Sequence, residues 1–173
     1  ESKFIFSTKT SYAFSFLAFA MIIKAAATAI AITVTMATAI PLADKISLNL
    51  SGNYSWQKAV DVTNKEAKNY KHQLPYTPEH NGNVSATFEM PWVNVGYTVT
   101  MVSKRYFLAQ NVPANQIDRY NEHTATLWRE FKFKNCGLRL QAEVINLTDA
   151  QYDVIKYYPM PGRSWRLTMM VNF

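Results

Sequence analysis

Hydrophobic and polar side chains alternate along much of this chain. The clearest case is residues 46–56, whose apolar positions are Ile46, Leu48, Leu50, Tyr54 and Trp56. The positions between them are Ser47, Asn49, Ser51, Asn53 and Ser55. Because successive side chains of a strand point to opposite faces, this segment is predicted to be a strand with one apolar and one polar face.

The same alternation recurs from the first residues to the last. It predicts further strands at residues 1–9, 28–40, 83–90, 93–102, 122–133, 138–146 and 164–173. The last of them ends on Phe173, and an outer-membrane barrel places aromatic residues of this kind at the membrane–water interface. The chain is therefore expected to form about eight or nine strands.

One segment breaks the pattern and leaves two interpretations open. Residues 12–23 are continuously apolar, and an alanine-rich run follows Lys24 as far as Ala31. A membrane helix needs roughly 20 apolar residues, which the combined run just provides. A signal peptide is a related possibility, since Lys9 precedes the apolar run. The strand-like residues 1–9 favour the alternative that this region continues the sheet.

The connections between the predicted strands alternate in length. Short ones lie at 41–45, 90–92 and 134–137, and long polar ones at 57–79, 103–121 and 147–163. Outer-membrane barrels have short periplasmic turns and longer extracellular loops. Trp56, Trp92 and Trp165 fall at strand ends, as an interfacial aromatic girdle requires. The predicted fold class is all-β, an antiparallel transmembrane β-barrel whose polar faces line a wet lumen.

Composition agrees with a barrel and removes several function classes. Hydrophobic residues make up 49% of 173 residues, yet the mean hydropathy is only −0.14, because alternation averages the two faces. The net charge is +6, but no run of five basic residues occurs, so nucleic acid is not an expected partner. Cys136 has no suggested catalytic base, and His72, His80 and His123 lack the spacing of a zinc site. We expect no enzyme, no metal site and no cofactor.

Two groups of motifs resemble a known family. The segment 73–80, QLPYTPEH, is similar to the PYTPxH segment of TonB-dependent outer-membrane receptors. The residues NLTD at 146–149, Tyr152, YPMPGR at 158–163 and the terminal Phe173 resemble the C-terminal signature of that family. The residues that carry the resemblance are Pro75, Tyr76, Pro78, Asn146, Asp149, Tyr152, Pro159, Pro161, Gly162, Arg163 and Phe173. The prolines and Gly162 are expected to shape the last loop, and Arg163 to pair with a carboxylate of a neighbouring loop.

The resemblance implies a receptor that imports a scarce ligand. Family barrels have about 22 strands around a plugged lumen. Residues 1–173 would then be the C-terminal segment of such a barrel, with the rest of the wall, the plug and the energy-coupling box elsewhere. The implied partners are outer-membrane lipid, an inner-membrane energy-coupling complex and a metal chelate: a siderophore, haem or cobalamin. A small self-contained barrel with an anchoring or adhesion role is the alternative, and a passive porin is a third.

Aromatic and cationic residues gather in or beside the long loops. They are Tyr70, Tyr76, Arg105, Tyr106, Tyr120, Tyr157 and Tyr158. Aromatic rings with a few cations can hold a large, partly apolar, anionic ligand such as a metal chelate. The alternative is an aromatic belt whose cations touch anionic lipid headgroups. Both interpretations place these residues at the extracellular end of the barrel.

Overall fold

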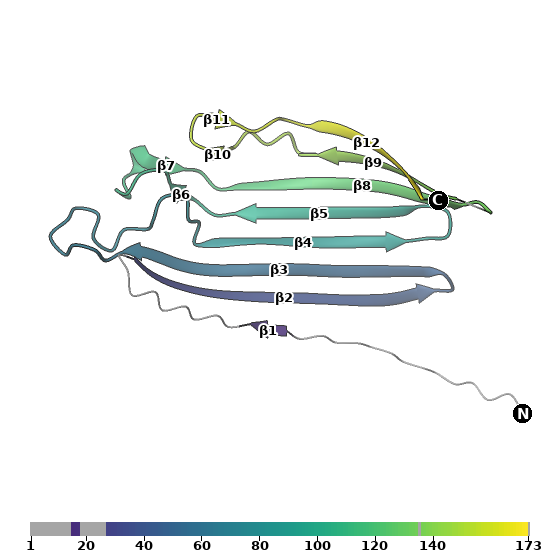
Figure 1. Cartoon of the computed structure of the whole chain (residues 1–173), viewed down its shortest axis with the longest axis horizontal. Coiled ribbons are helices and arrows are strands. Elements are labelled where there is room, and N and C mark those ends of the chain that lie inside the picture. The colour runs from purple at the N-terminus through teal and green to yellow at the C-terminus, as the bar shows by residue number, and fades with distance from the viewer. Residues whose placement is uncertain (1–14, 18–26, 135, 173) are drawn as a thin grey trace, which may run out of the picture.

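A single antiparallel sheet dominates the computed structural model, which describes residues 15–17, 27–134 and 136–172. Its eight strands are β1 (Ser15–Leu17), β2 (Ala27–Ala43), β3 (Ile46–Asp61), β4 (His80–Glu89), β5 (Asn94–Val102), β8 (Tyr120–Lys132), β9 (Gly137–Ile145) and β12 (Ser164–Asn172). They pair in chain order, β1-β2-β3-β4-β5-β8-β9-β12, each with its neighbour (Figure 1). The all-β antiparallel prediction is confirmed.

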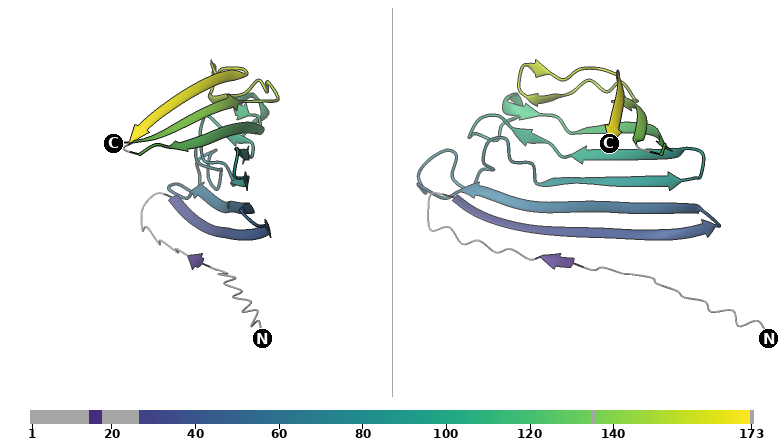
Figure 2. Two further views of the ribbon diagram at one scale, coloured as in Figure 1. Left: turned by 90° about the vertical axis from the view of Figure 1, so that its right-hand side faces the viewer. Right: turned by 45° about the vertical axis from the view of Figure 1, so that its right-hand side comes forward.

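The sheet is an open arc. β1 and β12 lie at opposite edges, and the views of Figure 2 show a curved wall from β2 to β12. A spanning sheet in a bilayer has to be closed, because an open edge leaves backbone N–H and C=O groups unpaired. The described strands therefore form part of a wall and do not close into a small barrel by themselves.

Cross-strand register divides the side chains between two faces. One row runs through Val95, Leu127, Ala142 and Leu167, and its neighbours on the same face are also mainly apolar. The other face carries Ser, Thr, Asn and Gln, together with every carboxylate of the eight sheet strands in the described ranges: Asp61, Glu89, Glu122, Glu130 and Glu143. We call these the apolar face and the polar face.

The predicted strands are present, and several are longer than the alternation indicated. β3 continues five residues past Trp56 to Asp61, and β2 runs through Pro41 with a register shift between Pro41 and Ala43. The tight turn follows at Asp44 and Lys45, where Lys45 has φ 63°. Because Pro41 has no N–H for the ladder, the shift lets the pairing resume at Ala43.

The structure describes only part of the N-terminal segment for which a helix, a signal peptide and a strand were the alternatives. Residues 27–31 belong to β2, so the alanine-rich run is a strand there and not a helix. Ser15–Leu17 pair with β2, while the strand expected at 1–9 and the closing Phe173 lie outside the described residues. In the part of the chain that the structure describes, no helix has the length and hydrophobicity to cross a membrane.

All three long connections gather at one end of the sheet, and the short turns lie at the other (Figure 1). The second long connection contains β6 (Arg105–Tyr106), a 3₁₀ turn η1 (Pro113–Asn115) and β7 (Gln116–Ile117). The third contains the hairpin of β10 (Asp153–Ile155) and β11 (Tyr158–Pro159). The predicted segregation of loop lengths is therefore present, and these loops fold into small ordered units.

Candidate functional site: a groove at the loop end of the polar face

The three long loops meet over the polar face and leave an open groove of about 450 Å³. It is lined by Tyr76, Pro78, Val102, Arg105, Tyr120, Val154 and Ile155. Val102 and Tyr120 are direct cross-strand partners on the polar face, and the other residues come from the loops. Three of the predicted ligand contacts, Tyr76, Arg105 and Tyr120, thus come together in what we call the rim groove.

Tyr76 reaches the rim groove because its loop is tied down on both sides. Its backbone N–H donates to the carbonyl of Tyr106 at 2.7 Å, which joins the first long loop to the second. The Gln57 side chain donates to the carbonyl of Pro78 at 2.9 Å, and the Gln57 N–H donates to the carbonyl of Glu79 at 2.8 Å. Tyr76 itself has φ 57°, so the chain turns sharply at this residue.

Arg105 is the cation of the rim groove, and it is buried, with only 3% of its surface exposed. Its Nη2 donates to the carbonyls of Asp153 and Val154 at 2.7 and 2.9 Å, and its guanidinium lies 5.6 Å from the Tyr120 ring centre. Its Nη1 is buried and has no hydrogen-bond acceptor among the described atoms. A buried donor left without an acceptor is costly, and Nη1 is the one nitrogen of this guanidinium group that burial leaves unsatisfied among the described groove residues.

Tyr120 of β8, which lies next to the Arg105 guanidinium, stacks on Tyr152 of the third long loop. The rings of Tyr120 and Tyr152 lie 4.0 Å apart and 12° from parallel. The Tyr152 hydroxyl donates to Oε2 of Glu122, two residues along β8 from Tyr120. Burial, and then the bond to Glu122, raise the pKa of Tyr152 above its ordinary value, so the phenol stays protonated and keeps donating. Arg105, Tyr120, Tyr152 and Glu122 form one connected unit.

The remaining predicted contacts flank the rim groove without lining it. Tyr106 contributes its backbone carbonyl, and Tyr70 lies in the first long loop with Lys71 Nζ 5.5 Å above its ring. Tyr157 and Tyr158 are 77% and 70% exposed on the hairpin of β10 and β11. Within the described ranges, no three His, Cys, Asp or Glu side chains gather in a way that could hold a metal ion.

Comparison with known proteins decides the family. Residues 30–147 match the domain family described as TonB dependent receptor-like, beta-barrel. The chain belongs to the TonB-dependent receptor family. Among curated proteins no match was found. The family and the barrel architecture place this receptor segment in the bacterial outer membrane, where its apolar face meets lipid and its polar face meets the lumen.

Solved structures share the fold at low sequence identity. They include the ferric preacinetobactin receptor BauA from Acinetobacter baumannii, with a TM-score of 0.68, 13% identity, and coverage of 95% of this chain and 26% of BauA. The ferric citrate transporter FecA, in its unliganded form, gives a TM-score of 0.65 and 12% identity, and the match covers 86% of this chain and 29% of FecA. The siderophore receptor PiuA from Acinetobacter baumannii gives a TM-score of 0.63 and 19% identity, and the match covers 83% of this chain and 22% of PiuA. The chain thus spans about a quarter of the length of these receptors.

The C-terminal motif of this receptor segment is a compact structural unit. Asn146 is 1% exposed, and its Nδ2 donates to the carbonyls of Ala150 and Pro161 at 2.9 and 3.3 Å. Its Oδ1 accepts the Ala150 N–H at 2.9 Å. Asp149 closes the unit, because its Oδ1 accepts the Arg163 N–H at 2.8 Å. The motif therefore fixes where the third long loop leaves β9 and enters β12.

The expected pairing of the Arg163 side chain with a carboxylate was wrong. Its Nε donates instead to the carbonyl of Leu147 at 3.0 Å, and only its backbone N–H meets the carboxylate of Asp149. Gly162 allows this approach, since a Cβ there would lie 2.6 Å from Asp149 Oδ1. Pro159 lies in β11 and Pro161 supplies one carbonyl to Asn146, so both prolines serve the loop and not the rim groove.

Two sets of residues near the polar face were not predicted from the sequence. Val154 and Ile155 line the rim groove, but a short apolar pair in a long loop gives no signal of its own. Trp128 faces the lumen near the short turns, where the Arg139 guanidinium lies 5.2 Å from its ring. The available signal was its position in the alternation, since Trp128 shares the face of Thr126 and Glu130.

Proposed function

We propose that residues 1–173 form the C-terminal segment of the barrel wall of an outer-membrane receptor that takes up a metal chelate. The observation that carries the proposal is the rim groove, which brings Tyr76, Arg105 and Tyr120 together at the loop end of the lumenal face. This is the end from which an external ligand enters a barrel of this kind. The groove combines apolar walls, aromatic rings and one buried guanidinium, which suits a large, partly apolar, anionic ligand.

A ferric siderophore is the chelate that the comparisons favour. The solved relatives are named for ferric preacinetobactin, ferric citrate and siderophore recognition. A siderophore offers carbon surface for Tyr76 and Ile155, and its negative charge is favoured beside the Arg105 guanidinium that lines the groove. Haem and cobalamin also combine apolar and anionic groups, and they are therefore included as competing ligands in the test below.

Uptake needs parts beyond this segment. The open edges at β1 and β12 have to pair with further strands before the wall can stand in a bilayer. We infer that the rest of the wall, a lumenal plug and an inner-membrane energy-coupling complex complete the receptor. In this arrangement the segment contributes one side of the ligand entrance, and the plug transmits the energy.

The test measures ligand binding by the full-length receptor in detergent, with tryptophan fluorescence as the readout. Ferric catecholate, ferric hydroxamate, ferric citrate, haem and cyanocobalamin are titrated separately. Tyr76→Asn removes the ring but tolerates the positive φ of this position, and Ile155→Ser removes apolar lining from an exposed loop residue. Each is expected to weaken binding of one ferric siderophore about tenfold, as is usual for contacts that matter at an interface.

Tyr158→Ser is the matched control, because Tyr158 is an exposed loop tyrosine outside the rim groove. It is expected to leave affinity unchanged. Tight binding of haem or cobalamin, with no binding of any ferric siderophore, would replace the proposed ligand class. Siderophore binding that survives both groove variants would contradict the role of the rim groove.

A further inference from the structure

The apolar face carries a trough between β8, β9 and β12. In one cross-strand row Ala142 lies directly between Leu127 and Leu167. Because the alanine side chain is short and its neighbours are long, the surface is hollowed along β9. The hollow measures about 440 Å³. It is lined by Val93, Leu127, Trp128, Arg129, Phe131, Leu140, Gln141, Ala142, Leu167, Thr168 and Met169.

One cation, Arg129, stands in this trough. It is the direct cross-strand partner of Leu140, one row closer to the short turns than Ala142. Its guanidinium lies 4.9 Å from the ring centre of Phe131. The two ion pairs of the described residues join Arg139 to Glu130 and Arg166 to Glu143. Arg129 therefore has no carboxylate partner in the described ranges, and the strand carboxylates lie on the opposite face.

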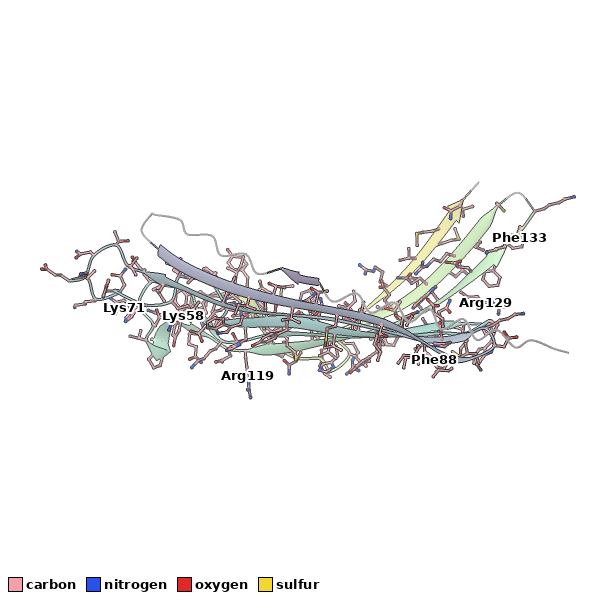
Figure 3. The ribbon with its side chains drawn as sticks, turned by 90° about the horizontal axis from the view of Figure 1, so that it is seen from below. Lys58, Lys71, Phe88, Arg119, Arg129 and Phe133 are labelled. Carbon is pink, nitrogen blue, oxygen red and sulfur yellow. The ribbon has the colours of Figure 1, made fainter. Side chains whose placement is uncertain are left out.

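The position of Arg129 along β8 sets its depth in the membrane. It lies three residues before the end of the strand at Lys132, which is about 10 Å at the rise of a β-strand. Trp92 and Phe133, each 59% exposed, mark the interface at the neighbouring short turns. Figure 3 shows Arg129 and Phe133 toward one end of the sheet, with Lys58 and Lys71 toward the other. A long arginine side chain can reach headgroup level from there.

We propose that the trough binds one glycerophospholipid of the periplasmic leaflet. An acyl chain lies along Ala142 between Leu127 and Leu167, and the phosphate accepts hydrogen bonds from Arg129. An unpaired cation on a lipid-facing surface is costly, and a phosphate is the anion available at this depth. Apolar walls with a single guanidinium complement an amphiphile with a single anionic group, and on a lipid-facing surface that amphiphile is a phospholipid. The planar guanidinium can hold a phosphate through two parallel hydrogen bonds.

The proposal is tested on the full-length receptor by native mass spectrometry. The delipidated receptor in detergent is titrated with phosphatidylglycerol, and the bound stoichiometry and affinity are measured. Arg129→Gln is expected to lower the affinity of one tight site about tenfold, the usual weight of a hydrogen bond to a charged group. Ala142→Leu fills the trough and keeps the guanidinium, and it is expected to weaken the same site.

Lys132→Gln is the matched control, since it removes one positive charge from the same end of β8 on the polar face. It is expected to leave the tight site intact. Circular dichroism is used to check that each variant keeps its sheet. Arg129→Lys keeps the charge without the planar fork and is expected to recover part of the affinity. Equal loss in Arg129→Gln and Lys132→Gln, or no loss in Arg129→Gln, would overturn the proposal. Displacement of the lipid by inorganic phosphate alone would also overturn it, because the acyl seat would then contribute nothing.

Discussion

Substitution of Asn146 gives the most quantitative prediction. Its side chain takes part in three hydrogen bonds, two donated by Nδ2 and one accepted by Oδ1, and it is 1% exposed. Its φ is 53°, a left-handed conformation that asparagine and glycine tolerate better than alanine. Asn146→Gly removes the three bonds but keeps the backbone relaxed, whereas Asn146→Ala removes them and also strains the backbone.

The magnitudes follow from these contacts. A hydrogen bond contributes about 1 kcal/mol net, so three lost bonds cost roughly 3 kcal/mol. The left-handed conformation adds about 1 kcal/mol for alanine. Opening of the third long loop should therefore become about 100-fold more frequent in Asn146→Gly, and more frequent again in Asn146→Ala.

Hydrogen exchange of the full-length receptor, followed by mass spectrometry of peptides from residues 146–163, measures this opening directly. The Ala150 amide is the most sensitive site, because its acceptor is the Asn146 side chain itself. Asn49→Ala, on the polar face of β3, is the control and is expected to leave exchange in this loop unchanged. Exchange in either Asn146 variant within tenfold of the wild type would refute the structural role assigned to the motif.

Three further predictions rest on single contacts. Gly162→Ala should displace the Asp149 carboxylate and raise exchange in the same loop, because the new Cβ would lie 2.6 Å from Oδ1; unchanged exchange would contradict this. Gly82→Ala should destabilise the fold by about 1–3 kcal/mol, because its Cβ would meet a backbone oxygen at 2.6 Å. Gly137→Ala is the control, because its Cβ would meet nothing within 4 Å, and it should leave the thermal melt unchanged. The raised pKa of Tyr152 means that the stability it contributes is present below pH about 10 and is lost as pH rises through the raised value. The absorbance difference between wild type and Tyr152→Phe should therefore show no tyrosinate near pH 10, and half-titration there would contradict the assignment.

The sheet was predictable because lipid and lumen impose opposite demands on successive residues. This demand weakens where a loop covers the strand, which explains why the end of β3 was missed. Ala59 lies there on the polar face but is buried, and its carbonyl accepts the Leu74 N–H at 2.9 Å. Polarity at residues 57–61 therefore reflects contact with the first long loop and no longer separates lipid from water.

The rim groove was predictable only in part. Aromatic and cationic loop residues were reasonable candidates, and three of the seven line the groove. Sequence could not show that Arg105 is buried, because the carbonyls that hold it belong to Asp153 and Val154, nearly fifty residues further along the chain. A contact between two loops depends on how the strands on either side of them are arranged in the folded sheet. No local pattern in the sequence predicts it.

The central claim is that this segment is a wall with lipid on one face and a water-filled lumen on the other. Cysteine labelling along β8 tests it most directly, in the full-length receptor in outer-membrane vesicles and with Cys136 replaced by serine. Single cysteines at Thr124 and Thr126 should react with a membrane-impermeant maleimide, and those at Ala125 and Leu127 should be protected. Equal reactivity at all four positions, or the reverse alternation, would contradict the account.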